Sequence, residues 1–165
     1  MPSHRLLGID PGLVATGYGL IEPGPSAAAV VVASGVISTD GSLSLEARLQ
    51  QVYDGVDRVL AELAPSTVVI EDLYTEYSFP RTALLMAHAR GVICLAAMQH
   101  KVPVLALAPA AVKRAIAAHG NASKAQVQES VRRLLHLETL PRPSHVADAL
   151  ALALTGLSRT GGRLA

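Results

Sequence analysis

Residues 5–12 read Arg5-Leu6-Leu7-Gly8-Ile9-Asp10-Pro11-Gly12, a short apolar run that ends in a carboxylate and two turn-forming residues. The apolar residues predict a buried strand, and the proline and glycine turn the chain directly after it. Residues 16–21 resume a strand pattern, so we expect a hairpin with room beside Asp10. An aspartate at the end of a strand is often only a turn residue, so its position alone does not assign a function to Asp10.

A second carboxylate ends a second strand-like segment. Residues 66–72 read Ser66-Thr67-Val68-Val69-Ile70-Glu71-Asp72, and the β-branched run predicts a central strand covered on both faces. If this strand lies beside the first, Glu71 and Asp10 converge. Two neighbouring carboxylates repel each other unless a cation or a shared proton offsets the charge, and of these two we favour a metal ion.

A third segment carries a histidine and another carboxylate. Pro141 and Pro143 end the preceding segment, and Ser144 is a candidate N-cap for an apolar helix that must be buried. His145 and Asp148 are three residues apart, which places both on one face near the start of this helix. Asp148 can also serve only to complement the helix dipole, but that interpretation leaves His145 and the two strand-end acids unexplained.

The other segments complete an alternation of strands and helices that is typical of an α/β protein. Three antiparallel strands come first, and a helix that crosses over to residues 67–70 makes the fourth strand parallel to the first. This arrangement brings Glu71 beside Asp10. The further expected elements are a third strand in two parts (28–33 and 35–38) after a turn at 23–26, helices at 44–63, 82–99 and 110–119, a strand at 102–107, and a helix from Lys124 with a capping box of Ser123 and Gln126.

With these residues in view, the chain resembles the RuvC family of Holliday-junction resolvases. The matching segments cover nearly the whole chain and occur in the family's order: Gly8-Ile9-Asp10-Pro11-Gly12, Thr16-Gly17-Tyr18-Gly19, Ile70-Glu71, Ala89-Arg90-Gly91, Val112-Lys113, Lys124-Ala125-Gln126-Val127-Gln128 and Ala147-Asp148-Ala149-Leu150-Ala151. The resemblance implies an RNase H-like fold, with a mixed five-stranded sheet and helices on both faces. It also implies a metal-dependent, structure-selective endonuclease that acts in recombination and DNA repair.

The resemblance places two divalent metal ions, Mg²⁺ or Mn²⁺, on four ligands: Asp10, Glu71, His145 and Asp148. Paired ions can activate a water molecule and stabilise the leaving oxygen of a phosphodiester. The family more often has an aspartate at the position of His145, and an imidazole favours manganese relative to an all-oxygen site. A histidine ligand must be deprotonated, so we expect activity to fall as His145 becomes protonated.

Two lysines complete the candidate site. Lys124 falls in the first turn of its expected helix, where a cation opposes the helix dipole, whereas a helix N-terminus together with a lysine suits a bound phosphate. We therefore expect Lys124, as a catalytic residue, and Lys113 to contact DNA phosphate or its developing charge. Four other basic residues are expected to form a solvated surface: Arg132, Arg133, Arg159 and Arg163.

The polar loop after Glu71 holds three of the chain's five aromatic residues. Aromatic side chains beside an acidic cleft can stack on unpaired bases, but they can also pack onto their own loop. The resemblance points to an aromatic residue shortly after the second acid. Tyr74 matches its place, although a phenylalanine is more usual there, and Phe79 is the second candidate. Arg81 follows as a further candidate DNA contact.

The expected helix at 82–99 is rich in alanine and other small residues. Small side chains allow close approach, which suits either a two-fold contact between subunits or packing on the subunit's own sheet. The resemblance favours a homodimer, because two identical sites related by a two-fold axis match two target strands of opposite polarity. It also implies the branch-migration complex RuvA–RuvB as a partner.

Length and composition limit the possible domain organisation and class of protein. The 165 residues and 50% hydrophobic content fit a single domain, 1–165, with a flexible basic tail from about residue 157. The net charge of +1 neither indicates nor excludes nucleic-acid binding. Cys94 is the only cysteine, so no intrachain disulfide can form, and we expect it to be a small core residue. We expect a soluble cytoplasmic protein with no apolar run near membrane-spanning length.

Two other functions fit parts of the pattern. An ATPase of the actin and hexokinase type also offers an aspartate followed by a glycine turn, but it needs two lobes to enclose a nucleotide, and this chain is too short for both. A catalytically silent nucleic-acid-binding module can keep the RNase H-like fold, although four intact site positions argue against it.

Overall fold

The structure is a computed structural model that describes residues 4–25, 28–73 and 80–161. The elements follow the order expected from the sequence. They are β1 (Leu6–Asp10), β2 (Ala15–Pro23), β3 (Ala29–Ser38), α1 (Leu45–Leu63), β4 (Thr67–Glu71), α2 (Pro80–Gln99), β5 (Val104–Leu107), α3 (Pro109–Ala117), α4 (Lys124–Leu134) and α5 (Ser144–Arg159).

The strands form a mixed five-stranded sheet in the order β3-β2-β1-β4-β5. β2 pairs antiparallel with both β1 and β3, whereas β4 pairs parallel with both β1 and β5. Ile9 of β1 lies opposite Ile70 of β4, so Asp10 and Glu71 follow at the ends of adjacent strands. The predicted crossover through α1 is therefore confirmed.

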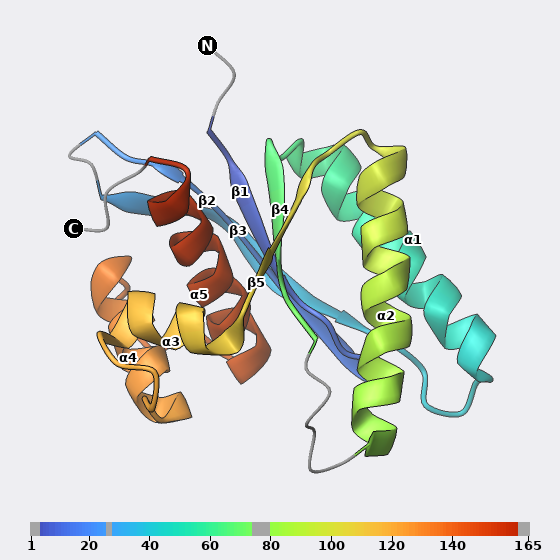
Figure 1. The fold of residues 1–165 in the computed structure, drawn as a ribbon. Coiled ribbons are helices and arrows are strands. Elements are labelled where there is room, and N and C mark those ends of the chain that lie inside the picture. Colours follow the sequence, from blue (N-terminus) through green and yellow to red (C-terminus); the bar gives the residue numbers. More distant parts are fainter. Residues whose placement is uncertain (1–3, 26–27, 74–79, 162–165) are drawn as a thin grey trace.

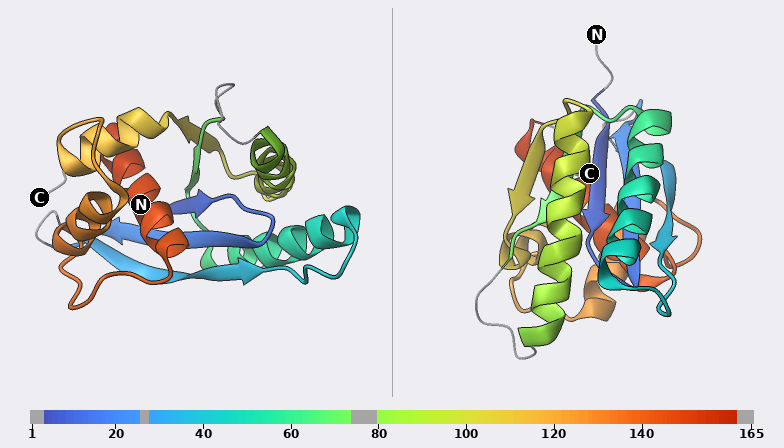
Figure 2. Two further views of the ribbon diagram at one scale, coloured as in Figure 1. Left: turned by 90° about the horizontal axis from the view of Figure 1, so that it is seen from below. Right: turned by 90° about the vertical axis from the view of Figure 1, so that its right-hand side faces the viewer.

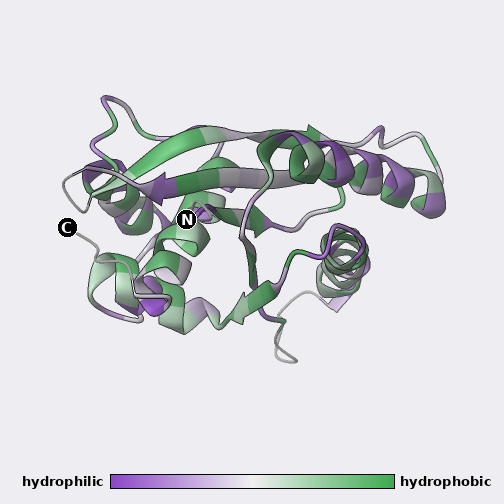
Figure 3. Ribbon diagram, turned by 90° about the horizontal axis from the view of Figure 1, so that it is seen from above, coloured by the Kyte–Doolittle hydropathy of each residue, from purple (hydrophilic) through white to green (hydrophobic). Residues whose placement is uncertain are grey.

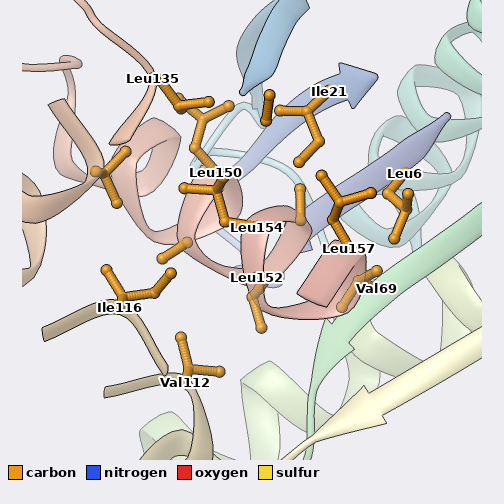
Figure 4. Close-up of a cluster of buried hydrophobic side chains, with 14 of the residues drawn as sticks. Leu6, Ile21, Val69, Val112, Ile116, Leu135, Leu150, Leu152, Leu154 and Leu157 are labelled. Atoms are coloured by element: carbon orange, nitrogen blue, oxygen red, sulfur yellow. The ribbon is translucent and has the colours of Figure 1, made fainter. Parts of the chain in front are cut away.

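Helices cover both faces of this sheet (Figure 1 and Figure 2). α1 and α2 enclose one hydrophobic cluster with Leu7 and Ile9 of β1, while α3, α4 and α5 enclose the other with Leu6 of the same strand. Successive side chains of a strand point to opposite faces, so β1 serves both layers. Figure 4 shows the second cluster, in which leucines of α5 lie between Ile21 and Val69 of the sheet and Val112 and Ile116 of α3.

α5 is the central helix of the second layer and is buried along most of its length, as its apolar sequence predicts. Two glycines let it approach the sheet closely. A Cβ atom at Gly8 would overlap the backbone carbonyl of Ala149, and one at Gly17 would overlap that of His145. The glycines of the first hairpin therefore bring the start of α5 against the end of β1.

α1 has the apolar face and the hydrophilic face expected of a helix at the protein surface. Ser44 is its N-cap and accepts a hydrogen bond from the backbone N–H of Ala47. Its apolar positions face the sheet, and hydrophilic residues recur along the rest of the helix (Figure 3). The helix thus closes its layer as the spacing of its apolar residues predicts.

Several boundaries differ from the expectations. Ser144 is not an N-cap: α5 begins at Ser144 and Pro143 is the cap residue, because the carbonyl of Pro143 already accepts the N–H of Val146. The tail was expected from about residue 157, but Leu157 is buried and α5 continues to Arg159. Burial of an apolar side chain holds this last turn on the core.

α2 also differs from expectation. Its 20 residues make it, within the described residues, the one helix that is long and apolar enough to cross a membrane by length and composition alone. The expectation that no apolar run approaches this length was therefore wrong. One such helix is weak evidence for a span, and here α2 packs against α1 and the sheet.

Candidate active site

Asp10 and His145 are in direct contact at the junction of β1 and α5. Nδ1 of His145 lies 3.0 Å from Oδ2 of Asp10. The Asp10 side chain is 14% exposed and that of His145 42%, so the aspartate forms the inner part of the pair. The close approach at Gly17 fixes the backbone of His145 beside the hairpin.

Asp148 and Lys124 form a second pair one helical turn further along α5. Nζ of Lys124 lies 3.1 Å from Oδ2 of Asp148. The predicted capping box is present, since Ser123 and Gln126 bond reciprocally at the start of α4. Lys124 therefore projects from a fixed first turn toward the strand-end acids.

Glu71 completes the group of carboxylates. Burial, and then the charges of Asp10 and Asp148, raise the pKa of Glu71 from 4.5 to about 7, while Lys113 and Lys124 lower it. Burial also raises the pKa of Asp10, against the hydrogen bond from His145. Such mutual effects require the groups to be close in space, so the three acids and two lysines share one site.

A cleft of about 220 Å³ opens beside these groups. Its polar wall contains Glu71, Asp148 and the two lysines, and its other wall is apolar. The lining residues are Glu71, Pro109, Val112, Lys113, Lys124, Val127, Asp148, Ala151 and Leu152. Charged groups beside an apolar wall are weakly screened by solvent, which strengthens their interactions with a charged ligand.

The donor set suits a hard divalent cation, because carboxylate oxygens with one imidazole are ligands that Mg²⁺ or Mn²⁺ accepts. Burial first, and then the charges of neighbouring acids, raise the pKa values of Asp10 and Glu71, and a cation would offset the part that is due to these charges. Among the described residues, however, no three histidine, cysteine or acidic side chains are already grouped to hold one ion. Asp10 is instead paired with His145, and Asp148 with Lys124.

Of the other predicted DNA contacts, the structure describes Lys113 and Arg81. Lys113 lines the cleft, and its contact with DNA phosphate stays a prediction. Arg81 lies exposed in the first turn of α2 and is not part of the cleft lining. Tyr74 and Phe79 lie outside the described residues.

Two features of the site did not follow from the residues. The apolar wall comes from α3, α4 and α5, which sequence spacing cannot place together. Arg90 of α2 donates from Nε to the carbonyl oxygen of Glu71, at 3.0 Å. The only signal for Arg90 was its place in the segment Ala89-Arg90-Gly91.

A sheet in this order, with acids at the ends of β1 and β4 and at the start of α5, defines an RNase H-like protein with the site of a nuclease. The chain belongs to the RuvC family, since the family model described as "Crossover junction endodeoxyribonuclease RuvC" matches residues 6–156. The rival ATPase and silent-module interpretations are accordingly not favoured.

Similar proteins agree with this membership. The RuvC of Rhodopirellula baltica is 43% identical over 152 residues, 92% of this chain and 84% of the relative. That of Gloeobacter violaceus is 41% identical over 156 residues, 94% of this chain and 89% of the relative. Members of the family depend on divalent metal ions, so a general metal dependence follows from membership.

Solved structures support the same conclusion. The structure of T. thermophilus RuvC in complex with Holliday junction substrate superposes with a TM-score of 0.87 at 35% identity, covering 96% of this chain and 97% of that one. The yeast mitochondrial Holliday junction resolvase Ydc2 has a TM-score of 0.65 at 14% identity, covering 93% of this chain and 78% of that one, and shows the shared fold alone.

Proposed function

We propose that this protein resolves four-way Holliday junctions by paired, symmetric, metal-dependent hydrolysis of DNA phosphodiesters in recombination and repair. The observation that carries the proposal is the convergence of Asp10, Glu71 and Asp148 from β1, β4 and α5, with the pKa of Glu71 raised to about 7. Buried acids with perturbed pKa values that face one cleft are typical of functional sites.

The four ligands have distinct parts in this proposal. Asp10, Glu71, His145 and Asp148 would hold two divalent ions, and these ions would supply activation of the attacking water and stabilisation of charge at the leaving 3′ oxygen. Glu71 must lose its proton for this role, and cation binding favours that loss. The imidazole of His145 removes one negative charge from the set and favours Mn²⁺ while still permitting Mg²⁺.

The two lysines of the cleft, Lys113 and Lys124, are proposed to contact DNA phosphates. Lys124 is paired with Asp148. If Asp148 held a divalent ion, this carboxylate would no longer need Lys124 to compensate its charge, and Lys124 could contact DNA phosphate. Lys113, on the same cleft, then contacts the neighbouring phosphate. A lysine is a mobile point charge, which suits an exchange of this kind.

A homodimer would supply the second active site. α2 presents an exposed stripe, spaced alternately by four and three residues, that consists of Leu84, His88, Gly91, Leu95 and Met98. Leu84, Leu95 and Met98 are 65%, 53% and 75% exposed, and this spacing is that of a seam between two packed helices. We propose that two copies meet along this stripe, which we call the α2 seam.

The remaining assignments follow from family membership. The protein is proposed to act as a single domain, in the cytoplasm, on junctions that the RuvA–RuvB complex migrates. Tyr74 and Phe79 remain the candidate residues for stacking on junction bases, with Arg81 as a further contact.

The test is cleavage of a synthetic four-way junction with Mg²⁺ or Mn²⁺, with Asp10→Asn as the matched control. Paired nicks at symmetric positions that vanish in the variant support a resolvase. Binding without nicks would instead identify a silent DNA-binding module, and nucleotide turnover an ATPase.

A further inference from the structure

Arg90 joins α2 to the last residue of β4. Its Nε donates to the carbonyl oxygen of Glu71 at 3.0 Å, and its Nη2 lies 3.6 Å from Oδ1 of Asp72. The Arg90 side chain is 21% exposed, so most of this arginine is enclosed between the helix and the end of the strand. A partly buried charge is costly unless it is paired and hydrogen-bonded, and Arg90 has one hydrogen bond to the Glu71 carbonyl and an ion pair with the Asp72 carboxylate.

The segment that follows Glu71 is held from the other side as well. The N–H of Asp72 donates to the carbonyl of Leu107 in β5 at 2.8 Å, and the carboxylate of Asp72 accepts from the N–H of Leu73 at 3.0 Å. The main chain at Glu71 and Asp72 is thus fixed between β5 and Arg90. The direction of the Glu71 side chain depends on this main chain.

We propose that Arg90 is a positioning residue for Glu71: by bonding to the backbone carbonyl, it holds the carboxylate toward the cleft in the orientation that metal binding requires. The inference rests on the proposed function, because it takes Glu71 to be a metal ligand. Partners that orient a ligand commonly contribute as much as about 10- to 100-fold to metal affinity or activity.

The planar guanidinium explains why an arginine occupies this position. Nε and Nη2 point in fixed directions and can bond two acceptors at once. A lysine offers one mobile point charge, so Arg90→Lys keeps the charge and loses one of the two contacts. Arg90→Gln loses the charge and the fork together.

The experiment compares Arg90→Gln and Arg90→Lys with the wild type and with Arg58→Gln, which alters an exposed arginine of α1. Calorimetric titration of Mn²⁺ into the full-length, DNA-free protein measures ion affinity without turnover. Junction cleavage gives kcat, KM and the Mn²⁺ concentration at half-maximal rate. Thermal unfolding reports whether each variant is folded.

We expect Arg90→Gln to weaken Mn²⁺ binding and lower kcat by about 10-fold each, with KM for the junction unchanged. Arg90→Lys should fall between this variant and the wild type, and Arg58→Gln should match the wild type. Wild-type Mn²⁺ affinity in both Arg90 variants would overturn the inference, as would a change in KM alone, which would make Arg90 a DNA contact.

The experiment also distinguishes a variant that does not fold from a failure of the proposed function. If Arg90→Gln does not fold, the Mn²⁺ affinity of the isocharged Arg90→Lys variant decides between positioning and structural roles. If the wild type fails to cut junctions, the proposed function fails, while the calorimetric comparison still tests whether Arg90 orients Glu71.

Discussion

Nδ1 of His145 lies 3.0 Å from Oδ2 of Asp10, although 135 positions separate the two residues in the chain. The contact joins the end of the first strand to the start of the last helix. It also lowers the pKa of Asp10, whereas burial, the larger effect, raises it. Burial and the hydrogen bond thus have opposite effects on the pKa of Asp10. Substitutions in this site should therefore change activity, stability or their pH dependence in directions that can be measured.

Asp10→Asn should abolish cleavage and preserve junction binding. The amide has nearly the same shape but no charge, so the substitution removes a carboxylate that we propose as an ion ligand and should leave the fold intact. Metal ions contribute several kcal/mol to such reactions, which corresponds to a loss on the order of 10³-fold in rate. Rates and binding of a labelled four-way junction would be measured side by side. Residual cutting near the wild-type rate would exclude Asp10 from the site.

Metal-free protein should be less stable at pH 8 than at pH 5. The folded-state pKa of Glu71 is raised from 4.5 to about 7, so the native state holds its proton more tightly than the unfolded chain does. Stability is then highest below pH 4.5 as far as this group is concerned, and falls as the pH rises through 7. The loss amounts to at most about 3 kcal/mol, and urea unfolding in a chelator measures it.

Glu71→Gln is the control for this pH dependence. A glutamine cannot ionise, so the variant should lose most of the fall in stability between pH 5 and pH 8 that the wild type shows. Divalent cations added at pH 8 should stabilise the wild type and have little effect on the variant. If stability fell equally with pH in the two proteins, the raised pKa of Glu71 would not be the cause of the fall.

His145→Asp should move the acid limb of the rate profile to lower pH. A metal-binding histidine must be neutral, whereas an aspartate ionises at lower pH. The variant should also work better with Mg²⁺ relative to Mn²⁺, because an oxygen donor replaces nitrogen. The measurement is cleavage rate against pH with each ion, and identical acid limbs in both proteins would remove His145 from the ligand set.

The sequence was sufficient to predict how the acids meet. A crossover between two apolar strands makes them parallel, and parallel neighbours end at the same edge of the sheet, so Asp10 and Glu71 could be paired before the structure was known. The location of Asp148 near the start of a buried helix also followed from spacing. These predictions rest on backbone geometry, which short patterns describe well.

Contacts that depend on how helices pack could not be predicted. The bond from Arg90 to the Glu71 carbonyl exists because α2 passes the end of β4. No local sequence pattern predicts that these two elements lie side by side. The small residues of α2 left two interpretations open. Ala89, Ala96 and Ala97 are buried in the core of their own subunit, whereas the contact between subunits stays a proposal.

Gly17→Ala should destabilise the fold and reduce activity together. The added methyl group would overlap the backbone carbonyl of His145, so β2 and α5 must separate. Overpacking of this kind costs about 1–3 kcal/mol. Gly41→Ala is the matched control, because nothing lies within 4 Å of its Cβ position, and it should stay within about 0.5 kcal/mol of the wild type. Denaturant unfolding and junction cleavage measure both effects, and equal stability of the two variants would mean that α5 does not need the close approach.

Leu95→Glu should convert a dimer into folded monomers. Leu95 lies 53% exposed in the middle of the α2 seam, so a glutamate there is solvated in the monomer but would be buried, unpaired, and repeated by symmetry in the dimer. Burying unpaired charge costs several kcal/mol, and about 3 kcal/mol already weakens association on the order of 100-fold. Sedimentation equilibrium measures the dissociation constant, and cleavage should change from paired cuts to slow single nicks. Leu43→Glu, at a residue 41% exposed outside the seam, should remain dimeric. If Leu95→Glu associates as tightly as Leu43→Glu, the subunits meet on another face, and the exposed side of α2 has some other role.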